Sequence, residues 1–104
     1  MCADRIQAKE NSVVFERFAV NGTTFCVNCH VRLATCVHEM IPRSKVPNLW
    51  FLLCNRVPLC TECHEWAHQI GTKQSAPIIR QNRDRYVEAF GINPEGLDIS
   101  DVLW

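Results

Sequence analysis

Hydrophobic and polar residues alternate along this chain in a way that predicts short helices and strands. The apolar residues between Ser12 and Val20 favour a helix with Ser12 as its N-cap, although a strand over 13–18 fits the same pattern. Residues 32–40 roughly alternate, and 50–54 (WFLLC) is the longest apolar run, as in a buried strand. We therefore expect a pair of strands preceded by a short helix.

Two further helices are expected in the second half of the chain. One begins at Thr61 or Glu62 and runs to about residue 69, where Gly71 ends it. The other covers 78–90, with apolar residues at near-helical spacing, and Gly91 closes it. The expected class is thus α+β. It divides into an N-terminal lead (1–12), a central domain (13–75), and a C-terminal helix with a turn-rich tail (76–104).

Composition narrows the class of protein. With 104 residues and 47% apolar content, the chain forms a single small domain whose core needs an additional staple. The first residues lack the apolar stretch of a signal peptide, and no run reaches the ~18 apolar residues of a membrane helix. We therefore expect a cytoplasmic protein without membrane contact, in which thiols stay reduced.

Charge is segregated along the chain although the formal net charge is zero. A net charge of zero argues against a large basic surface for nucleic acid, but it is compatible with a small basic patch. The basic residues gather in three places, Arg43 with Lys45, Arg56, and Arg80 with Arg83 and Arg85, whereas acidic residues concentrate between 88 and 101.

Four of the seven cysteines form two C-x2-C pairs, Cys26 with Cys29 and Cys60 with Cys63, separated by thirty residues. Each such turn aims two thiolates at one point, and two turns complete the tetrahedron that zinc prefers. The pattern predicts a structural zinc that joins distant parts of the chain. The alternatives are four buried thiols without metal or, less favoured, a redox pair. The other cysteines have no partner spacing: Cys2, Cys36 and Cys54.

Three histidines form a second candidate metal site. His64 and His68 are four residues apart on an expected helix, so that both imidazoles share one face. The zinc pairs bracket a strand that ends near His38 and would hold it against that helix. A site with three protein ligands keeps open positions for water and substrate, which is typical of catalysis. By itself, a pair of histidines at this spacing is more often an ordinary part of a helix surface than a metal site.

Together these motifs resemble those of the HNH endonuclease family. The resemblance rests on Cys26-x2-Cys29, on the stretch VHEMIPRS, and on Asn55-x8-His64-x3-His68 with LCTECH, and it covers about residues 13–69. It implies a ββα-metal core stapled by a four-cysteine zinc and flanked by helices. Small proteins of this kind are frequent in bacteriophages, so that the host cytoplasm is the expected location.

The resemblance also implies roles for individual residues. His38, His64 and His68 would bind a catalytic divalent ion (Mg²⁺, Mn²⁺, Ni²⁺ or Zn²⁺), and Asn55 would brace the loop that holds the general base. Glu39 stands where the family usually has a histidine base. This is a departure, because an unperturbed glutamate is a weak base near neutral pH.

The implied activity is metal-dependent hydrolysis of phosphodiester bonds in double-stranded DNA, with phosphate contacts from Arg43, Lys45 and Arg56. The alternative is a zinc-stapled module that binds DNA or a protein with little or no catalysis. In that case the apolar end of the chain, 102–104, suits docking to a larger assembly such as a phage machine. A redox switch through the thiols is a third reading, which requires that zinc be absent.

Overall fold

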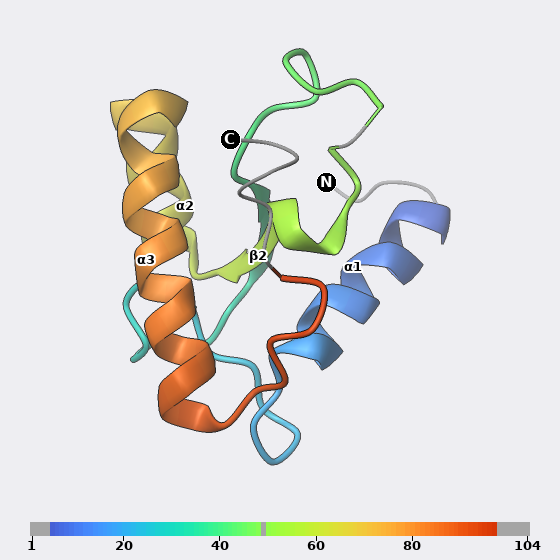
Figure 1. Cartoon of the computed structure of the whole chain (residues 1–104), viewed down its shortest axis with the longest axis vertical. Helices are drawn as coiled ribbons and strands as arrows, with labels where there is room; N and C mark the ends of the chain where they lie inside the picture. The colour runs from blue at the N-terminus through green and yellow to red at the C-terminus, as the bar shows by residue number, and fades with distance from the viewer. Residues whose placement is uncertain (1–4, 49, 98–104) are drawn as a thin grey trace.

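The computed structural model describes residues 5–48 and 50–97, and their side chains from Asn11 onward. A two-stranded sheet lies between helices that pack on both sides of it (Figure 1). Helix α1 (Arg5–Arg17) lies on one side, and α2 (Thr61–Ile70) and α3 (Thr72–Phe90) lie together on the other. The chain thus forms a small α+β fold in which an antiparallel hairpin is followed by helices.

The hairpin pairs β1 (Cys36–Glu39) with β2 (Arg56–Leu59) in antiparallel register, with His38 opposite Val57. A long segment, 40–55, connects the strands and ends in a 3-10 turn over Leu53–Asn55. All four residues of β2 are buried, because α1 and the rest of the core cover them.

The predicted second strand, 50–54, is wrong. Phe51 in this apolar run is 51% exposed, and the paired strand is Arg56–Leu59, where the sequence predicted no strand. Pro58 pairs across from Val37 within it. Proline cannot donate to a ladder, but a two-stranded sheet offers edge positions where none is required.

The first helix forms as a helix and not as the alternative strand, but it begins at Arg5 instead of Ser12. Residues 5–12 of the expected N-terminal lead thus belong to α1. Residues 5–10 (RIQAKE) are mostly good helix formers. Val14 and Phe18, four residues apart, are fully buried at the end of this helix.

Helix α2 agrees with the prediction and is followed by Gly71, whose φ of 88° lies in a region that favours glycine. Helix α3 begins at Thr72, six residues before the predicted start, and crosses the expected boundary between 75 and 76. Pro77 near its beginning removes one hydrogen-bond donor, which is why the sequence favoured a later start. Gly91, in the left-handed conformation, ends α3 as predicted.

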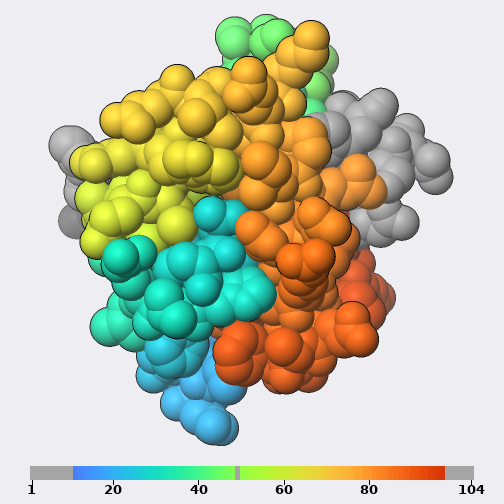
Figure 2. Space-filling model, turned by 90° about the vertical axis from the view of Figure 1, so that its left-hand side faces the viewer, coloured from blue at the N-terminus to red at the C-terminus, as the bar shows by residue number. Residues whose placement is uncertain are grey.

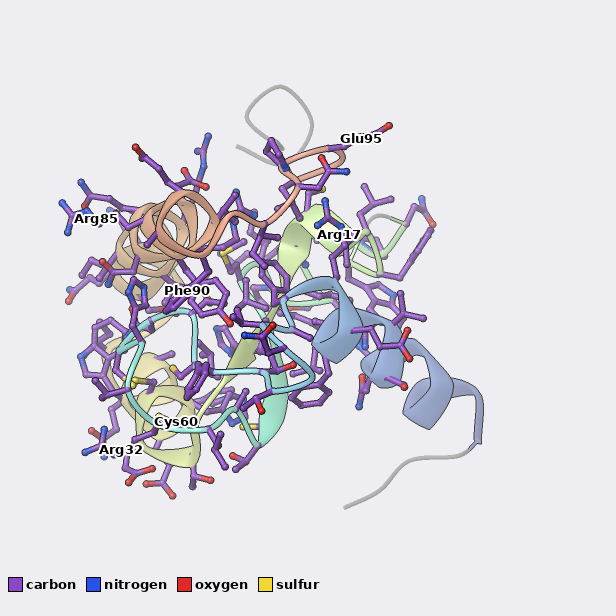
Figure 3. All side chains as sticks on the ribbon, turned by 90° about the horizontal axis from the view of Figure 1, so that it is seen from below. Arg17, Arg32, Cys60, Arg85, Phe90 and Glu95 are labelled. Atoms are coloured by element: carbon purple, nitrogen blue, oxygen red, sulfur yellow. The ribbon has the colours of Figure 1, made fainter. Side chains whose placement is uncertain are left out.

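Two side chains of α3 fasten this helix to the rest of the fold. The Tyr86 hydroxyl donates to the Phe18 carbonyl oxygen at 2.7 Å, and Arg83 Nη1 donates to the Cys54 carbonyl oxygen at 3.0 Å. After α3 the chain returns toward α1, where Arg17 Nη2 donates to the Glu95 carbonyl oxygen at 2.6 Å (Figure 3). Both ends of the described chain thus support the hairpin.

Within the described residues, no helix has the length and apolar character needed to cross a bilayer. The apolar end of the tail, 102–104, which the sequence suggested for docking, lies outside the residues that the structure describes.

Candidate metal centres

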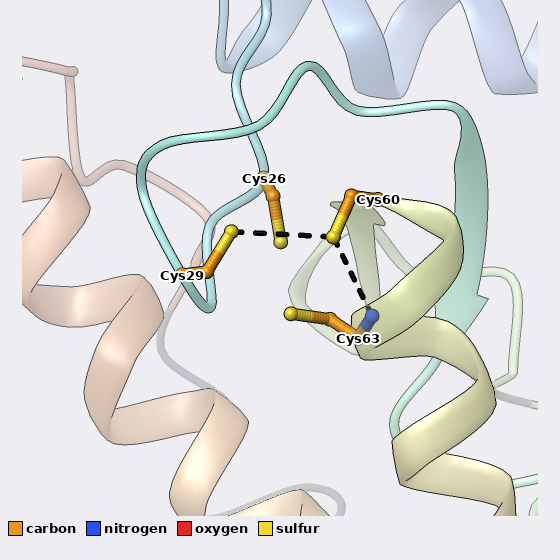
Figure 4. Close-up of side chains that lie close together, drawn as sticks. All are labelled: Cys26, Cys29, Cys60 and Cys63. Atoms are coloured by element: carbon orange, nitrogen blue, oxygen red, sulfur yellow. Dashed lines mark hydrogen bonds between the residues drawn. The ribbon is translucent and has the colours of Figure 1, made fainter.

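The four paired cysteines converge on one point (Figure 4). Their Sγ atoms all lie within 4.8 Å of one another, and Cys29 Sγ is 4.0 Å from Cys60 Sγ. Zinc with four thiolates at its usual bond length places sulfur atoms about 3.8 Å apart, whereas a disulfide requires about 2.05 Å. The geometry therefore fits a tetrahedral metal site, and this cluster could hold zinc.

Local structure explains how the two pairs reach this point. Cys26 and Cys29 lie in a turn before β1, where the Val27 amide donates to the Pro58 carbonyl oxygen at 3.1 Å and so fixes the turn on β2. Cys60 is the N-cap of α2, and its Sγ accepts from the Cys63 amide at 3.4 Å. One pair is thus set by the hairpin, and the other by the first turn of a helix.

The thiols are unequal. Burial raises the pKa of Cys26 and of Cys63. Burial also acts on Cys29, but the backbone amides of Arg32 and Val31 and the neighbouring cysteines outweigh it and lower its pKa to about 7. Of these three thiols, Cys29 most readily becomes a thiolate, while Cys26 and Cys63 need a cation to become ligands at neutral pH.

Asn28, Asn82 and His30, which the sequence did not assign to the zinc site, surround the cysteine cluster. Asn28 Nδ2 lies 3.4 Å from Cys63 Sγ, and Asn82 on α3 donates to Asn28 Oδ1 at 2.8 Å. His30 Nε2 lies 2.8 Å from the Val27 carbonyl oxygen and 2.9 Å from that of Asn82, so this nitrogen carries the hydrogen. Figure 2 shows the corresponding packing of the cysteine-turn segment against α2 and α3.

His30 is therefore occupied as a link between the cysteine turn and α3. Its φ of 67° and its ring contact with Tyr86, at 5.5 Å between centroids, reflect the same role. The only signal in the sequence was a polar residue inside or directly after a C-x2-C turn, which does not identify its partner.

The three histidines expected to converge do so. His38 comes from β1, and His64 and His68 come from one face of α2; their candidate ligand atoms lie within 4.8 Å of one another. His64 Nε2 and His68 Nε2 are 3.1 Å apart, close to the spacing of about 3.3 Å between imidazole ligands on one tetrahedral ion. This cluster is a possible second metal site.

His38 is the most enclosed of the three. Only 7% of it is exposed, and its Nε2 is buried without a hydrogen-bond partner among the described residues. Burial, followed by the proximity of His64 and His68, lowers the pKa of His38 to about 4; burial and His68 also lower the pKa of His64. Neutral imidazole is the form that binds a metal, so these shifts favour coordination over protonation.

A pocket of about 250 Å³ opens at this cluster. Glu39 reaches it together with His38, although neighbours on a strand usually face opposite ways, because Glu39 is the last residue of β1. The Glu39 carboxylate accepts from Arg43 Nε at 3.2 Å and 3.1 Å, and it is not part of the ligand cluster. The full lining consists of Val37, His38, Glu39, Pro42, Arg43, His64 and His68.

Asn55 is fully buried and ties together the two ends of the segment between the strands. The Ile41 amide donates to its Oδ1 at 2.8 Å, and its Nδ2 donates to the carbonyl oxygens of Ile41 and Trp50, both at 3.0 Å. Ile41 follows Glu39 by two residues, so Asn55 fixes the backbone next to the pocket.

The basic side chains differ in accessibility. Arg43 is exposed and lines the pocket, and Lys45, two residues further along the chain, is exposed. Arg56 is only 3% exposed and donates from Nη2 to Asn11 Oδ1, and Arg83 is buried, so neither guanidinium offers its surface to a phosphate. Arg85 on α3 points outward (Figure 3).

No protein-family model, curated protein or solved structure matches this chain. The structure itself shows a small α+β fold with a four-cysteine cluster that could hold zinc. A three-histidine cluster on the hairpin and its following helix is a possible second metal site.

Proposed function

We propose that this protein is a divalent-metal-dependent endonuclease that hydrolyses phosphodiester bonds of DNA, in the manner of the HNH family that its motifs resemble. The observation that carries the proposal is the convergence of His38, His64 and His68 from a hairpin and its following helix, with the buried His38 Nε2 lacking a partner among the described residues. A buried polar atom without a partner is costly unless a ligand satisfies it.

The donor set indicates which ions the histidines would hold. Three imidazole nitrogens suit nickel, manganese or zinc, and magnesium remains feasible if water and phosphate complete its shell. When bound, such an ion supplies positive charge next to the scissile phosphate. Zinc at the cysteine cluster has a structural role, because four thiolates leave it no open position.

Glu39 is the proposed general base. Its carboxylate would take a proton from water, the resulting hydroxide would attack phosphorus in line, and the 3′ oxygen would leave with the electron pair of the broken bond. A carboxylate offers about four acceptor sites, of which the shared N–H of Arg43 occupies two. The remaining sites are sufficient for a water, and the Glu39 side chain is 20% exposed at the pocket.

DNA contact is proposed for Arg43, which lines the pocket, and for Lys45, which is exposed two residues further along the chain. Because the formal net charge is zero, the attraction to DNA is local and weak, and it carries no sequence information. We therefore expect nicking or cleavage of double-stranded DNA with little sequence preference.

One observation favours the alternative of a zinc-stapled binding module. Arg43 Nε already donates to both oxygens of Glu39, and an ion pair of this kind is also what a purely structural carboxylate makes. In that case the protein would bind DNA or another protein without cutting.

The test is a plasmid-nicking assay in which conversion of supercoiled DNA to open circles is followed with Mg²⁺, Mn²⁺, Ni²⁺ or Zn²⁺ added in turn. We expect the intact protein to nick with at least one of these ions. His64→Ala and Glu39→Gln should each reduce the rate by about 10²-fold or more. Both variants must retain zinc and the far-UV circular dichroism of the intact protein.

Matched controls are the exposed residues Gln69 on α2 and Glu88 on α3. Gln69→Ala and Glu88→Gln remove side chains of similar kind outside the pocket and should nick at the rate of the intact protein. Absence of nicking by the intact protein with every ion would reject the endonuclease and leave the binding module.

A further inference from the structure

The guanidinium of Arg43 is held between an aromatic ring and a carboxylate. Its Cζ lies 3.6 Å from the centre of the Trp50 ring, and its Nε donates to Glu39 Oε1 at 3.2 Å and Oε2 at 3.1 Å. Among the described residues, these hydrogen bonds use only Nε of the guanidinium. One side chain thus connects Trp50, which does not line the pocket, with Glu39, which does.

Trp50 is itself fixed. Its amide donates to the Val46 carbonyl oxygen at 2.9 Å, and its carbonyl oxygen accepts from Asn55 Nδ2 at 3.0 Å. Asn55 also holds both backbone groups of Ile41, close to the end of β1. The tryptophan and the strand that carries Glu39 are therefore anchored to the same buried side chain.

This arrangement matters because an exposed ion pair by itself orients little. Arg43 is 47% exposed as a side chain, and such an arginine samples many rotamers whose loss offsets the gain from pairing. Stacking on a fixed indole restricts the planar guanidinium to a narrow range of positions. The carboxylate bound by Nε is restricted in turn.

We propose that Trp50 and Arg43 are positioning residues that orient the Glu39 carboxylate toward the histidine pocket. The inference rests on the proposed endonuclease function and adds Trp50 to the residues on which the reaction depends. A carboxylate displaced by about 1 Å can lose a factor of up to 10² in rate. Substitution of Trp50 should therefore slow the attack on phosphorus without touching a metal ligand or changing any charge.

The decisive variant is Trp50→Leu, tested with the metal ion that supports nicking by the intact protein. Under single-turnover conditions we expect a rate about 10- to 100-fold lower, with the dissociation constant for a DNA duplex, measured without added divalent ion and without chelator, changed by less than about twofold. Trp50→Phe keeps an aromatic face and should restore most of the rate. Phe51→Leu, which alters the neighbouring aromatic, should cut at the normal rate.

A double-mutant cycle separates orientation from general damage. Arg43→Lys keeps the charge but loses the planar fork. The connection from Trp50 through residue 43 to Glu39 is therefore already broken in this background. Trp50→Leu should then slow Arg43→Lys by less than about twofold. Equal effects of Trp50→Leu in both backgrounds would overturn the inference, as would a loss confined to DNA affinity.

Nuclear magnetic resonance tests the contacts of Arg43 with Trp50 and Glu39 independently of catalysis. In the intact protein, the Nε–H signal of Arg43 should be displaced from the position of a free arginine by the Trp50 ring and by Glu39. It should move toward the free position in Trp50→Leu and in Glu39→Gln, but not in Phe51→Leu.

Failure of the two proposals is distinguishable. If the intact protein nicks DNA and Trp50→Leu nicks equally fast, only the positioning inference fails. If the intact protein never nicks, the endonuclease function fails and the inference fails with it.

Discussion

Removal of the Asn55 side chain should destabilise the fold far more than its size suggests. Asn55→Ala deletes three hydrogen bonds, to the Ile41 amide and to the carbonyl oxygens of Ile41 and Trp50. Each contributes about 1 kcal/mol, and leaving the buried groups of Ile41 unpaired adds about 1 kcal/mol or more. The expected loss is roughly 3 to 5 kcal/mol, a large part of the ~5–15 kcal/mol that holds a domain of this size together.

Urea denaturation followed by far-UV circular dichroism measures this loss, with zinc held at the same saturating concentration in every sample, because metal binding shifts the apparent stability. At an m-value of about 2 kcal/mol/M, the midpoint should fall by roughly 1.5 to 2.5 M. The matched control is Asn48→Ala, which makes the same chemical change at an exposed position of the same segment and should shift stability by less than about 0.5 kcal/mol.

The reasoning would be refuted if Asn55→Ala lowered the midpoint no more than Asn48→Ala does. A related prediction concerns the affinity of the histidine cluster for a divalent ion. Because Asn55 fixes the backbone beside the pocket, whatever fraction of Asn55→Ala remains folded should bind a divalent ion at the histidines more weakly than the intact protein.

Three further outcomes are expected. Zinc content, measured by release to a colorimetric chelator, should fall to near zero in Cys63→Ala but stay unchanged in Cys36→Ser, because only the former belongs to the cluster. Burial raises the pKa of Tyr86, so the contribution of this residue to the stability of the fold is fully present below about pH 10 and is lost as pH rises further. Absorbance at 295 nm should show this tyrosine, the single one in the chain, ionising above its usual pH range. Ionisation in the usual range would contradict its burial. Metal affinity at the histidines should decrease between pH 6 and 5 with a slope of at most about two protons per ion, because a pKa of about 4 keeps His38 neutral there; a slope of three would count against the enclosure of His38.

The ligand clusters could be predicted because their chemistry is written in local spacing. A C-x2-C turn and a pair of histidines four apart each bring two ligands together without any knowledge of the fold. Only one long-range assumption was then needed for each site, namely that the hairpin lies against α2. Gly71 after the end of α2 marks this boundary of the helix in the sequence itself.

The strand β2 and the start of α1 could not be read in the same way. A four-residue strand that contains Pro58 and is buried on every side shows no alternation, whereas the apolar run at 50–54 looked more like a strand and instead exposes Phe51. The start of α1 lies in a polar stretch, where Asp4, a residue type favoured at N-caps, and the good helix formers after it are weak signals. The stacking of Arg43 on Trp50 depends on how segment 40–55 folds back, which no periodicity records.

Cys63 and His64 are consecutive residues of α2, so the two ligand clusters share one short helix. If both clusters hold ions, an ion that stabilises this helix would favour binding of the other, and thermodynamic reciprocity would make the two gains in affinity equal. Since the thiolates also anchor the first turn of this helix, a cell depleted of zinc would lose the imidazole site as well, even with every other divalent ion abundant. In that case zinc supply would limit how much of this protein can carry a second ion.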